Sequence, residues 1–309
     1  MGTSTMLNPP WPLVCATTYI GRRKVCVGRS PQHKPLLADS FTLVRYRSWP
    51  LVQSTERPLN THPDEHGEPS QNQLLAALPD ADWQRWQPQL EWVPLNVGQL
   101  LCEYGKTPAY AFFPTTAIVS LTYTTEDGAS AEFAVVGNDG VVGISLFMGG
   151  GATSSQAVVQ SAGMAWSLPA HAVSAEVDRA GAVLTMLLRY TQAMMVQVAQ
   201  TGACNRHHSI DQQLCRRLLM GLDRLGGDEL VMTQEAAAQL LGVRREGVTA
   251  AALKLQHAGV IRYHRGHIEV LDRSLLEERS CECYGAARRE QQRLMPLPLP
   301  LPLPLRLWS

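Results

Sequence analysis

The sequence predicts an α+β protein with an antiparallel β jelly-roll, a long helix and a C-terminal winged helix-turn-helix. Three observations predict it: short apolar segments separated by glycine-rich turns, a long stretch with helical periodicity, and a helix–glycine–helix–hairpin pattern near the C-terminus. The length of 309 residues, 45% of them hydrophobic, allows about two domains. We expect five regions, at residues 1–70, 71–170, 171–207, 208–292 and 293–309.

Residues 1–70 have no sustained periodicity of either kind. They contain scattered prolines, the basic cluster Arg22-Arg23-Lys24 and a polar stretch at residues 60–70. The cluster could contact nucleic acid, but composition favours a solvated tail. We therefore expect this N-terminal extension to be mostly disordered.

Residues 71–170, unlike the preceding segment, show patterns of regular secondary structure. Asn72–Leu78 and Asp82–Leu90 are typical of short helices, and turn signals such as Gly137-Asn138-Asp139-Gly140 separate the segments that follow. Many short strands at close spacing indicate an antiparallel sandwich or jelly-roll barrel. The predicted strands are Glu91–Leu95, Leu100–Tyr104, Tyr110–Phe113, Ile118–Thr124, Ala131–Val136, Ala157–Ser161 and Met164–Leu168.

A helical region begins at Pro169 and Ala170 and runs to about Arg206. It carries a 3-4-3 apolar seam that suits a partner helix, although such a stripe could instead pack on the barrel of its own chain. A further amphipathic helix is expected at Asp211–Leu225. The seam residues, our candidate dimerisation residues, are Leu184, Leu188, Thr191, Met195 and Val198.

The stretch Val231–Val270 predicts the winged helix-turn-helix. Thr233 can cap a helix that ends at Leu241, and Gly242 supplies the turn. A second helix, from about Arg244 to Ala258, has an apolar stripe that would pack on the first. That stripe consists of Val248, Ala252 and Leu255, and the expected wing strands are Val260–Tyr263 and His267–Val270, around a turn at His264-Arg265-Gly266.

The second helix has the properties of a helix that reads DNA. The major groove admits one helix, and residues near its N-terminus reach the base edges. Residues 71–203 contain 4 basic and 10 acidic residues, whereas Thr233–Ile268 contains 5 basic and 2 acidic residues. A helical hairpin with a solvated charged face is the alternative, but the glycine turn and the wing favour DNA. The predicted contacts are Arg245, Glu246 and Thr249 with bases, and Arg244, Arg262 and Arg265 with phosphates.

The C-terminal region contains two further patterns. Ser274–Arg293 is typical of a polar helix, and Pro296–Leu305 alternates proline with leucine. Alternating proline forbids helix and favours extended polyproline II. A partner-binding role is possible for this segment, but we expect residues 293–309 to be a disordered low-complexity tail.

The seven cysteines include no C-x-x-C pair, which argues against a disulfide framework or a zinc or iron-sulfur signature. Cys281 and Cys283 are two thiols that cannot complete a site alone, so we expect a structural or incidental role. Cys204, His207 and His208 invite a metal interpretation, but we favour helix-end roles. We therefore predict no metal and no cofactor, and we place the protein in the cytoplasm because no segment matches a membrane span.

The order of barrel, long helix and winged helix-turn-helix resembles the Crp/Fnr superfamily of bacterial transcription regulators. The similarity covers Gln71–Gln292 and is strongest in GVRREGVTAAALKLQHAGVIRYHRGHI and LEERSCECY. It implies a cyclic-nucleotide-binding-like sensor barrel, a dimerisation helix, a recognition helix in the DNA major groove, and RNA polymerase as a partner. Glu246 falls on the family's base-reading glutamate and Arg245 on an arginine that some members use. Ala250 stands where many members carry a base-reading arginine, so their operator half-site cannot be carried over.

The sensor departs from the family pattern. Where cyclic-nucleotide members hold the ribose and phosphate with a glutamate and an arginine, this chain has Gly143-Ile144 and Ser154-Ser155. Because charge-assisted hydrogen bonds are hard to replace, we predict a degenerate pocket without tight cyclic-AMP binding, open to an unknown small-molecule effector. Cys15 and Cys26 are too few and too far apart for the iron-sulfur cluster of oxygen-sensing members.

Our leading hypothesis is a homodimeric transcription regulator that binds double-stranded DNA. The alternative is a small-molecule-binding signalling protein whose helix-turn-helix is a partner surface. An enzyme is disfavoured because the sequence has no glycine-rich phosphate loop, no H-E-x-x-H motif and no nucleophile elbow.

Overall fold

The computed structural model describes residues 15–20, 23–28 and 67–295, and the chain divides into two compact units, residues 1–47 and 48–309. In the first unit, β1 (Cys15–Ile20) and β2 (Arg23–Gly28) form an antiparallel hairpin. This hairpin lies in the N-terminal extension that we expected to be mostly disordered. The other parts of the predicted extension before residue 67, and the tail from residue 296, lie outside the described residues.

The second unit begins with the predicted antiparallel barrel. Two short helices, α1 (Gln73–Ala76) and α2 (Asp80–Trp86), precede it. The strands lie within two residues of the predicted segments and form two sheets, in the orders β3-β9-β5 and β4-β8-β6-β7. They are β3 (Glu91–Leu95), β4 (Leu100–Cys102), β5 (Tyr110–Pro114), β6 (Ile118–Thr124), β7 (Ser130–Val136), β8 (Gln156–Ser161) and β9 (Gly163–Pro169).

Strands β6 and β7 are buried on both faces. Alternate residues of a strand point to opposite faces, and Val119 and Val136 pack in the barrel core while Ile118 and Val135 belong to a second core. That second core consists mainly of residues of the C-terminal helices. The sheet therefore separates two hydrophobic cores and contributes to both.

The helical region after the barrel is two helices, where the sequence suggested one. α3 (Ala170–Arg179) and α4 (Ala182–His207) are separated at Ala180, which has a φ of 53° in the left-handed region. A left-handed residue ends the run of α-helical hydrogen bonds, as is common at helix C-termini. The long helix of region 171–207 therefore begins at Ala182.

The C-terminal region starts with α5 (Ile210–Leu225), capped by a reciprocal capping box between Ser209 and Gln212. A three-stranded antiparallel sheet and two helices form the winged helix-turn-helix. Its remaining elements are β10 (Glu229–Val231), α6 (Gln234–Leu241), α7 (Arg245–His257), β11 (Ile261–His264) and β12 (His267–Val270).

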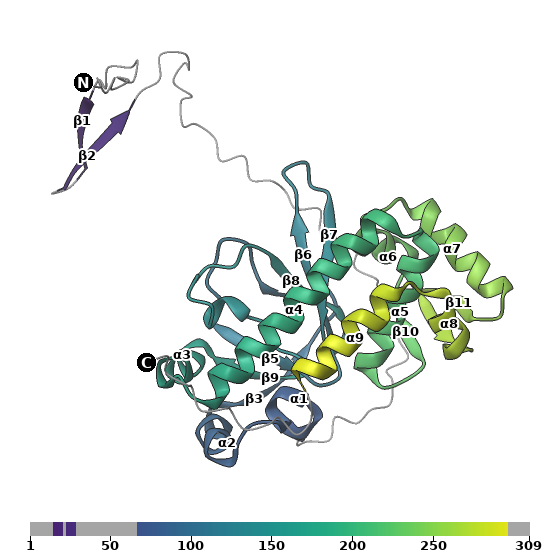
Figure 1. The fold of residues 1–309 in the computed structure, drawn as a ribbon, viewed down its shortest axis with the longest axis horizontal. Coiled ribbons are helices and arrows are strands. Elements are labelled where there is room, and N and C mark those ends of the chain that lie inside the picture. Colours follow the sequence, from purple (N-terminus) through teal and green to yellow (C-terminus); the bar gives the residue numbers. More distant parts are fainter. Residues whose placement is uncertain (1–14, 21–22, 29–66, 296–309) are drawn as a thin grey trace, which may run out of the picture. The chain divides into compact units, whose positions relative to one another are not determined.

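The predicted C-terminal polar helix is also divided, into α8 (Arg273–Arg279) and α9 (Glu282–Leu294). α9 lies alongside α4 (Figure 1), and Leu294 and Met295 are buried in the barrel core. The folded region thus extends past the predicted boundary at residue 292, because packing against the barrel removes these two apolar side chains from water. No helix within the described part of the chain is long and apolar enough to cross a membrane.

Candidate nucleic-acid interface

The first helix of the motif begins and ends as its sequence predicts. The Thr233 hydroxyl accepts a hydrogen bond of 3.1 Å from the Ala236 amide and so satisfies one of the free donors at the start of α6. Gly242 follows Leu241 with a φ of 66°, a conformation that favours glycine. Because the turn is this tight, α7 starts only a few residues after α6 ends.

The second helix, α7, packs through the predicted stripe. Val248, Ala252 and Leu255 are buried against the rest of the domain. The opposite side of the helix is consequently turned outward, and Ala250 lies there, exposed. The helix begins one residue later than predicted because Arg244 has the extended backbone of an N-cap.

Three of the predicted DNA-contacting residues lie at the exposed N-terminal end of α7. Arg244, Arg245 and Glu246 are all exposed, and within the described residues none of them forms an ion pair. Thr249 differs, because it is half-buried and its Oγ1 lies 2.7 Å from Gln234 Oε1 at the start of α6. The end of α7 therefore presents two guanidinium groups and one carboxylate to solvent, and the Thr249 hydroxyl already has a partner.

The wing is a tight hairpin held at its base. Arg265 and Gly266 have φ values of 48° and 85°, and His264 pairs with His267, so the two central residues form a primed hairpin turn. The Tyr263 hydroxyl donates to the Met232 carbonyl oxygen at 2.8 Å, and the Met232 amide donates to the Gly266 carbonyl oxygen at 2.7 Å. Burial raises the pKa of Tyr263 to about 12, so its hydroxyl stays a donor at neutral pH.

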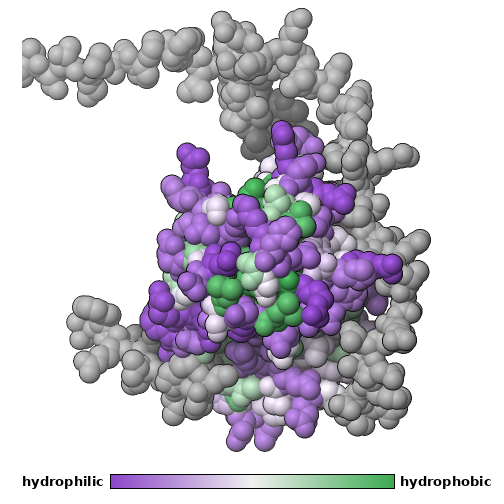
Figure 2. All heavy atoms as spheres, turned by 90° about the vertical axis from the view of Figure 1, so that its right-hand side faces the viewer, coloured by the Kyte–Doolittle hydropathy of each residue, from purple (hydrophilic) through white to green (hydrophobic). Residues whose placement is uncertain are grey.

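The two predicted phosphate contacts of the wing differ in availability. Arg265 is exposed at the tip, whereas Arg262, also exposed, lies 2.5 Å from Glu269 Oε2. A phosphate at Arg262 would have to share its guanidinium with that carboxylate. Figure 2 shows the side of the molecule where α7, β11 and α8 lie, and it is mainly hydrophilic with small apolar areas.

Comparison with known proteins agrees with this geometry. The family model of the Crp-like helix-turn-helix domain matches residues 212–279. The chain has a Crp/Fnr architecture. FixK2 from Bradyrhizobium japonicum has a similar fold, with a TM-score of 0.52, 14% identity, and coverage of 62% of this chain and 98% of FixK2. For a CRP-family transcriptional regulator from Thermus thermophilus the TM-score is 0.51 and the identity 16%, with coverage of 61% of this chain and 96% of that regulator. A search among curated proteins found no match to the sequence.

Within this Crp/Fnr architecture, the candidate dimerisation residues of α4 occupy different environments. Leu188, Met195 and Val198 are exposed by 53%, 65% and 36% of their surface, whereas Leu184 is half-buried. Thr191 is buried, and its hydroxyl donates to the Leu187 carbonyl oxygen, so it lies off the exposed seam. The helix packs on the barrel through a different face, which includes Met186, Tyr190 and Met194.

The candidate pocket residues of the Crp/Fnr-type barrel offer no charged group. Gly143 has a φ of 106° and precedes a 3-10 turn at Ile144–Leu146, while Ser154 is exposed and Ser155 half-buried. Lys106 is the only lysine or arginine between Glu91 and Pro169, and its Nζ lies 2.6 Å from Glu103 Oε2. A cyclic phosphate would therefore find no arginine on the barrel strands.

The structure also assembles two features that the sequence analysis did not find. Buried arginines of α5 reach acidic residues of the barrel, with Arg217 Nε 2.6 Å from Glu132 Oε1 and Arg224 2.7 Å from Asp139 Oδ2. A signal existed, because helical spacing places Arg217 beside Leu214 on the apolar stripe of α5. The second feature is a cluster of Cys204, His208, Cys281 and Cys283, which had been considered as two separate groups.

Proposed function

We propose that the protein is a sequence-specific DNA-binding transcription regulator that acts as a homodimer, with the barrel as the sensor of a signal. One observation carries the proposal: the N-terminal end of α7 exposes Arg244, Arg245 and Glu246 while the opposite face of the helix is buried. A helix docked in the major groove needs this division. The match of residues 212–279 to a Crp-like helix-turn-helix domain supports the same proposal.

The position of each exposed side chain on α7 or the wing suggests whether it would contact a base or a phosphate. Arg245 and Glu246, in the first turn of α7, would read base edges, since an arginine can donate two hydrogen bonds to guanine and a glutamate can accept one from cytosine. Thr249 would contact DNA only by exchanging or sharing its bond with Gln234. Arg244, Arg262 and Arg265 would contact phosphates, which fix the position of the protein without specifying sequence.

The homodimer would bring two recognition helices to one operator. Helix-turn-helix dimers read half-sites about one DNA turn apart, which is about 34 Å. Each domain carries only a modest excess of positive charge, so pairing two of them supplies affinity that one lacks. The exposed apolar residues Leu188, Met195 and Val198 on α4 support this pairing. RNA polymerase would be the further partner that such a regulator meets at a promoter.

The sensor would respond to something other than tight cyclic-AMP binding. The stretches Gly143-Ile144 and Ser154-Ser155 provide neither the arginine nor the carboxylate, and Lys106 already has an acidic partner. An anionic phosphate buried without a cation is unfavourable. Calorimetric titration with cyclic AMP should accordingly give no binding at micromolar concentrations.

Selection of DNA from a random duplex pool at moderate salt tests the proposal. The wild-type protein should enrich one sequence, and Arg245→Ala should relax the preference at one position of each half-site. The loss of discrimination should be about 1–3 kcal/mol, the range for one bidentate base contact.

Lys106→Ala is the matched control, because it removes one positive charge from the barrel, away from α7. It should leave both affinity and preference unchanged. If the wild-type protein enriches no sequence, the helix-turn-helix is a surface for another partner and the proposal fails. Unchanged preference in Arg245→Ala would show that α7 is not docked through its N-terminal end.

A further inference from the structure

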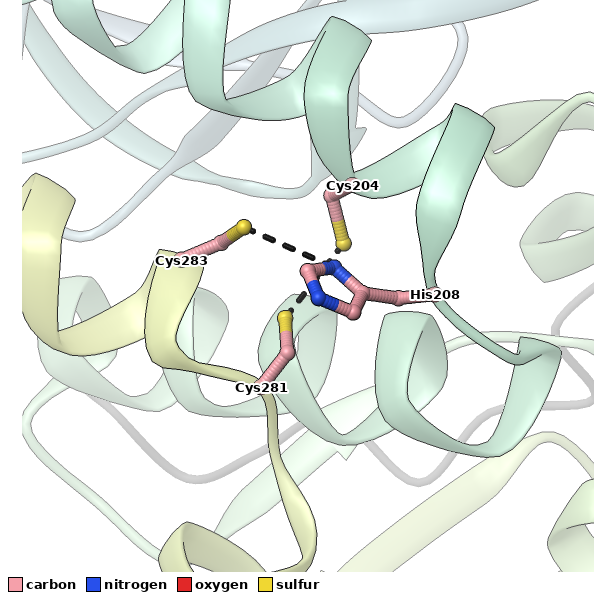
Figure 3. Close-up of side chains that lie close together, drawn as sticks. All are labelled: Cys204, His208, Cys281 and Cys283. Atoms are coloured by element: carbon pink, nitrogen blue, oxygen red, sulfur yellow. Dashed lines mark hydrogen bonds between the residues drawn. The ribbon is translucent and has the colours of Figure 1, made fainter.

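Four potential metal ligands meet at the hinge between α4 and α5, and none of them is among the residues proposed to contact DNA. Cys204 lies in the last turn of α4 and His208 is its C-cap, while Cys281 is the N-cap of α9 and Cys283 lies in its first turn. Figure 3 shows the four side chains converging from these two segments. Cys204 and Cys281 are separated by 77 positions, so only the fold brings the pairs together.

The ligand atoms have the spacing of a site for a single ion. All four lie within 4.8 Å of one another. The Sγ atoms of Cys204 and Cys281 are 3.5 Å apart, and Cys283 Sγ is 3.6 Å from His208 Nδ1. A tetrahedral zinc site with bonds of about 2.3 Å to sulfur and about 2.0 Å to nitrogen has edges of about 3.8 Å between sulfurs and about 3.5 Å between sulfur and nitrogen. The Cys204–Cys281 and Cys283–His208 distances agree with this tetrahedron to within a few tenths of an ångström.

The histidine is oriented as metal-binding histidines are. His208 Nδ1 lies 3.6 Å from Cys283 Sγ, and Nε2 lies 3.2 Å from Glu282 Oε1. A metal-ligating histidine usually donates its second ring N–H to a carboxylate, which fixes the tautomer and the orientation of the ring. Glu282 is placed to accept that hydrogen bond, although its side chain is largely exposed.

The burial of the three cysteines and a neighbouring arginine are compatible with a closed metal site of net negative charge. Cys204, Cys281 and Cys283 are exposed by 0%, 4% and 3%, and they form a small buried cluster of their own. The buried Arg216 guanidinium donates to the Thr201 hydroxyl at 3.0 Å and lies close enough to the three cysteines to interact with their charge. Three thiolates, one neutral histidine and a divalent cation would carry one negative charge, which a buried arginine close by would balance.

We propose that Cys204, His208, Cys281 and Cys283 bind one zinc ion that ties the α4–α5 hinge to the start of α9. A donor set of three sulfurs and one imidazole selects zinc over magnesium, calcium or manganese, which prefer oxygen ligands. All four positions come from the protein, so the ion is structural and leaves no open position for a substrate. Binding releases a proton from each cysteine that is protonated beforehand, and the metal accepts the resulting thiolate.

The position gives the ion a consequence for the whole C-terminal region. The chain between His208 and Cys281 contains α5, the helix-turn-helix, the wing and α8. The zinc ion would close this segment at its base and hold it against α4 and α9. Loss of the ion would therefore loosen the link between the long helix and the DNA-binding domain, whether or not α7 reads DNA.

Metal content of the purified full-length chain tests the proposal. Protein prepared under reducing conditions with zinc in the medium should contain one zinc ion per chain by elemental mass spectrometry. Cobalt(II) added after chelation should give the visible and sulfur-to-cobalt absorption of a tetrahedral thiolate site. Cys283→Ser should lose the bound zinc and weaken cobalt binding at least tenfold, and His208→Gln should shift the cobalt spectrum.

Cys215→Ser is the matched control, because Cys215 is also buried in the C-terminal region but lies outside the cluster. It should keep one zinc ion per chain. If Cys283→Ser does not fold, the cobalt spectrum of the wild-type protein decides alone. The proposal is overturned if reduced wild-type protein binds neither metal stoichiometrically, if Cys283→Ser binds as tightly as wild type, or if the protein carries iron-sulfur absorption instead.

Discussion

At the scale of single residues, Arg265 shows a conflict between local backbone preference and charge. It occupies the first central position of the wing turn, at a φ of 48°. Asparagine and glycine tolerate this conformation, whereas it costs other L-residues about 1–2 kcal/mol. A contact between the Arg265 charge and a DNA phosphate would offset this conformational cost.

Arg265→Asn should therefore change stability and DNA binding in opposite directions. The substitution introduces a residue that tolerates the left-handed region, so the free energy of unfolding should rise by up to about 1 kcal/mol in denaturant titrations. Affinity for all duplexes should fall, and the slope of log affinity against log salt should decrease by about 1, because one phosphate contact is lost.

Ala180→Gly is the control for this prediction. Ala180 is the other described non-glycine residue with a positive φ, 53°, and it lies between α3 and α4. Its replacement should also stabilise the protein, because glycine has no steric strain in this conformation. Its DNA binding and salt slope should equal those of wild type. Equal salt slopes for Arg265→Asn and wild type would remove Arg265 from the proposed interface.

At the scale of elements, α4 divides its apolar residues between two faces. Tyr190 and Met194 are buried on the barrel side, and the Tyr190 hydroxyl donates to the Val141 carbonyl oxygen at 3.1 Å. Leu188 and Met195 are more than half exposed and lie two turns apart along the same face. A second copy of the helix would cover this surface.

Met195→Glu should weaken the proposed dimer. A carboxylate placed in an apolar helix seam, and opposite its own copy, must be desolvated without a partner. We expect dimerisation at least tenfold weaker by sedimentation equilibrium. Met148→Glu is the control, because Met148 is an exposed methionine outside α4. A wild-type chain that stays monomeric, or a Met195→Glu chain that dimerises normally, would contradict the proposed role of α4.

At the scale of the whole second unit, the barrel and the C-terminal domain share buried charges. Arg217 and Glu132 are exposed by only 3% and 7%, and the Ser120 hydroxyl donates to Glu132 Oε2 at 2.5 Å. The guanidinium also contacts Gln160 of β8. A helix of the helix-turn-helix domain is thus bonded to two strands of the barrel.

Glu132→Gln should be strongly destabilising. It keeps the shape of the side chain but leaves Arg217 as a buried, uncompensated charge, a change that costs about 3–5 kcal/mol. Glu103→Gln, which breaks the exposed pair with Lys106, should cost less than about 1 kcal/mol. Denaturant titration of the two variants measures the difference. Equal stability of both would mean that the buried pair does not hold the barrel to α5.

The second unit also shows which features are local in the sequence. Thr233, Gly242 and the alternating apolar residues of the strands act on neighbours a few positions away, so caps, turns and strands were predicted closely. The helix break at Ala180 was missed because alanine is a good helix former. Gly181, the next residue and the N-cap of α4, is a local signal of a break that the prediction did not use.

The sequence alone therefore determined the order of barrel, long helix and winged helix-turn-helix, and the face of α7 that is exposed. Hydrophobic periodicity and glycine positions, which act over a few neighbouring residues, are enough to predict both features. Only the tertiary structure decided that Arg217 meets Glu132, that Thr191 lies off the exposed seam, and that Cys204 and His208 meet Cys281 and Cys283. The arginine–glutamate pair and the cysteine–histidine cluster join residues tens of positions apart, and the burial of Thr191 follows from how α4 packs on its neighbours.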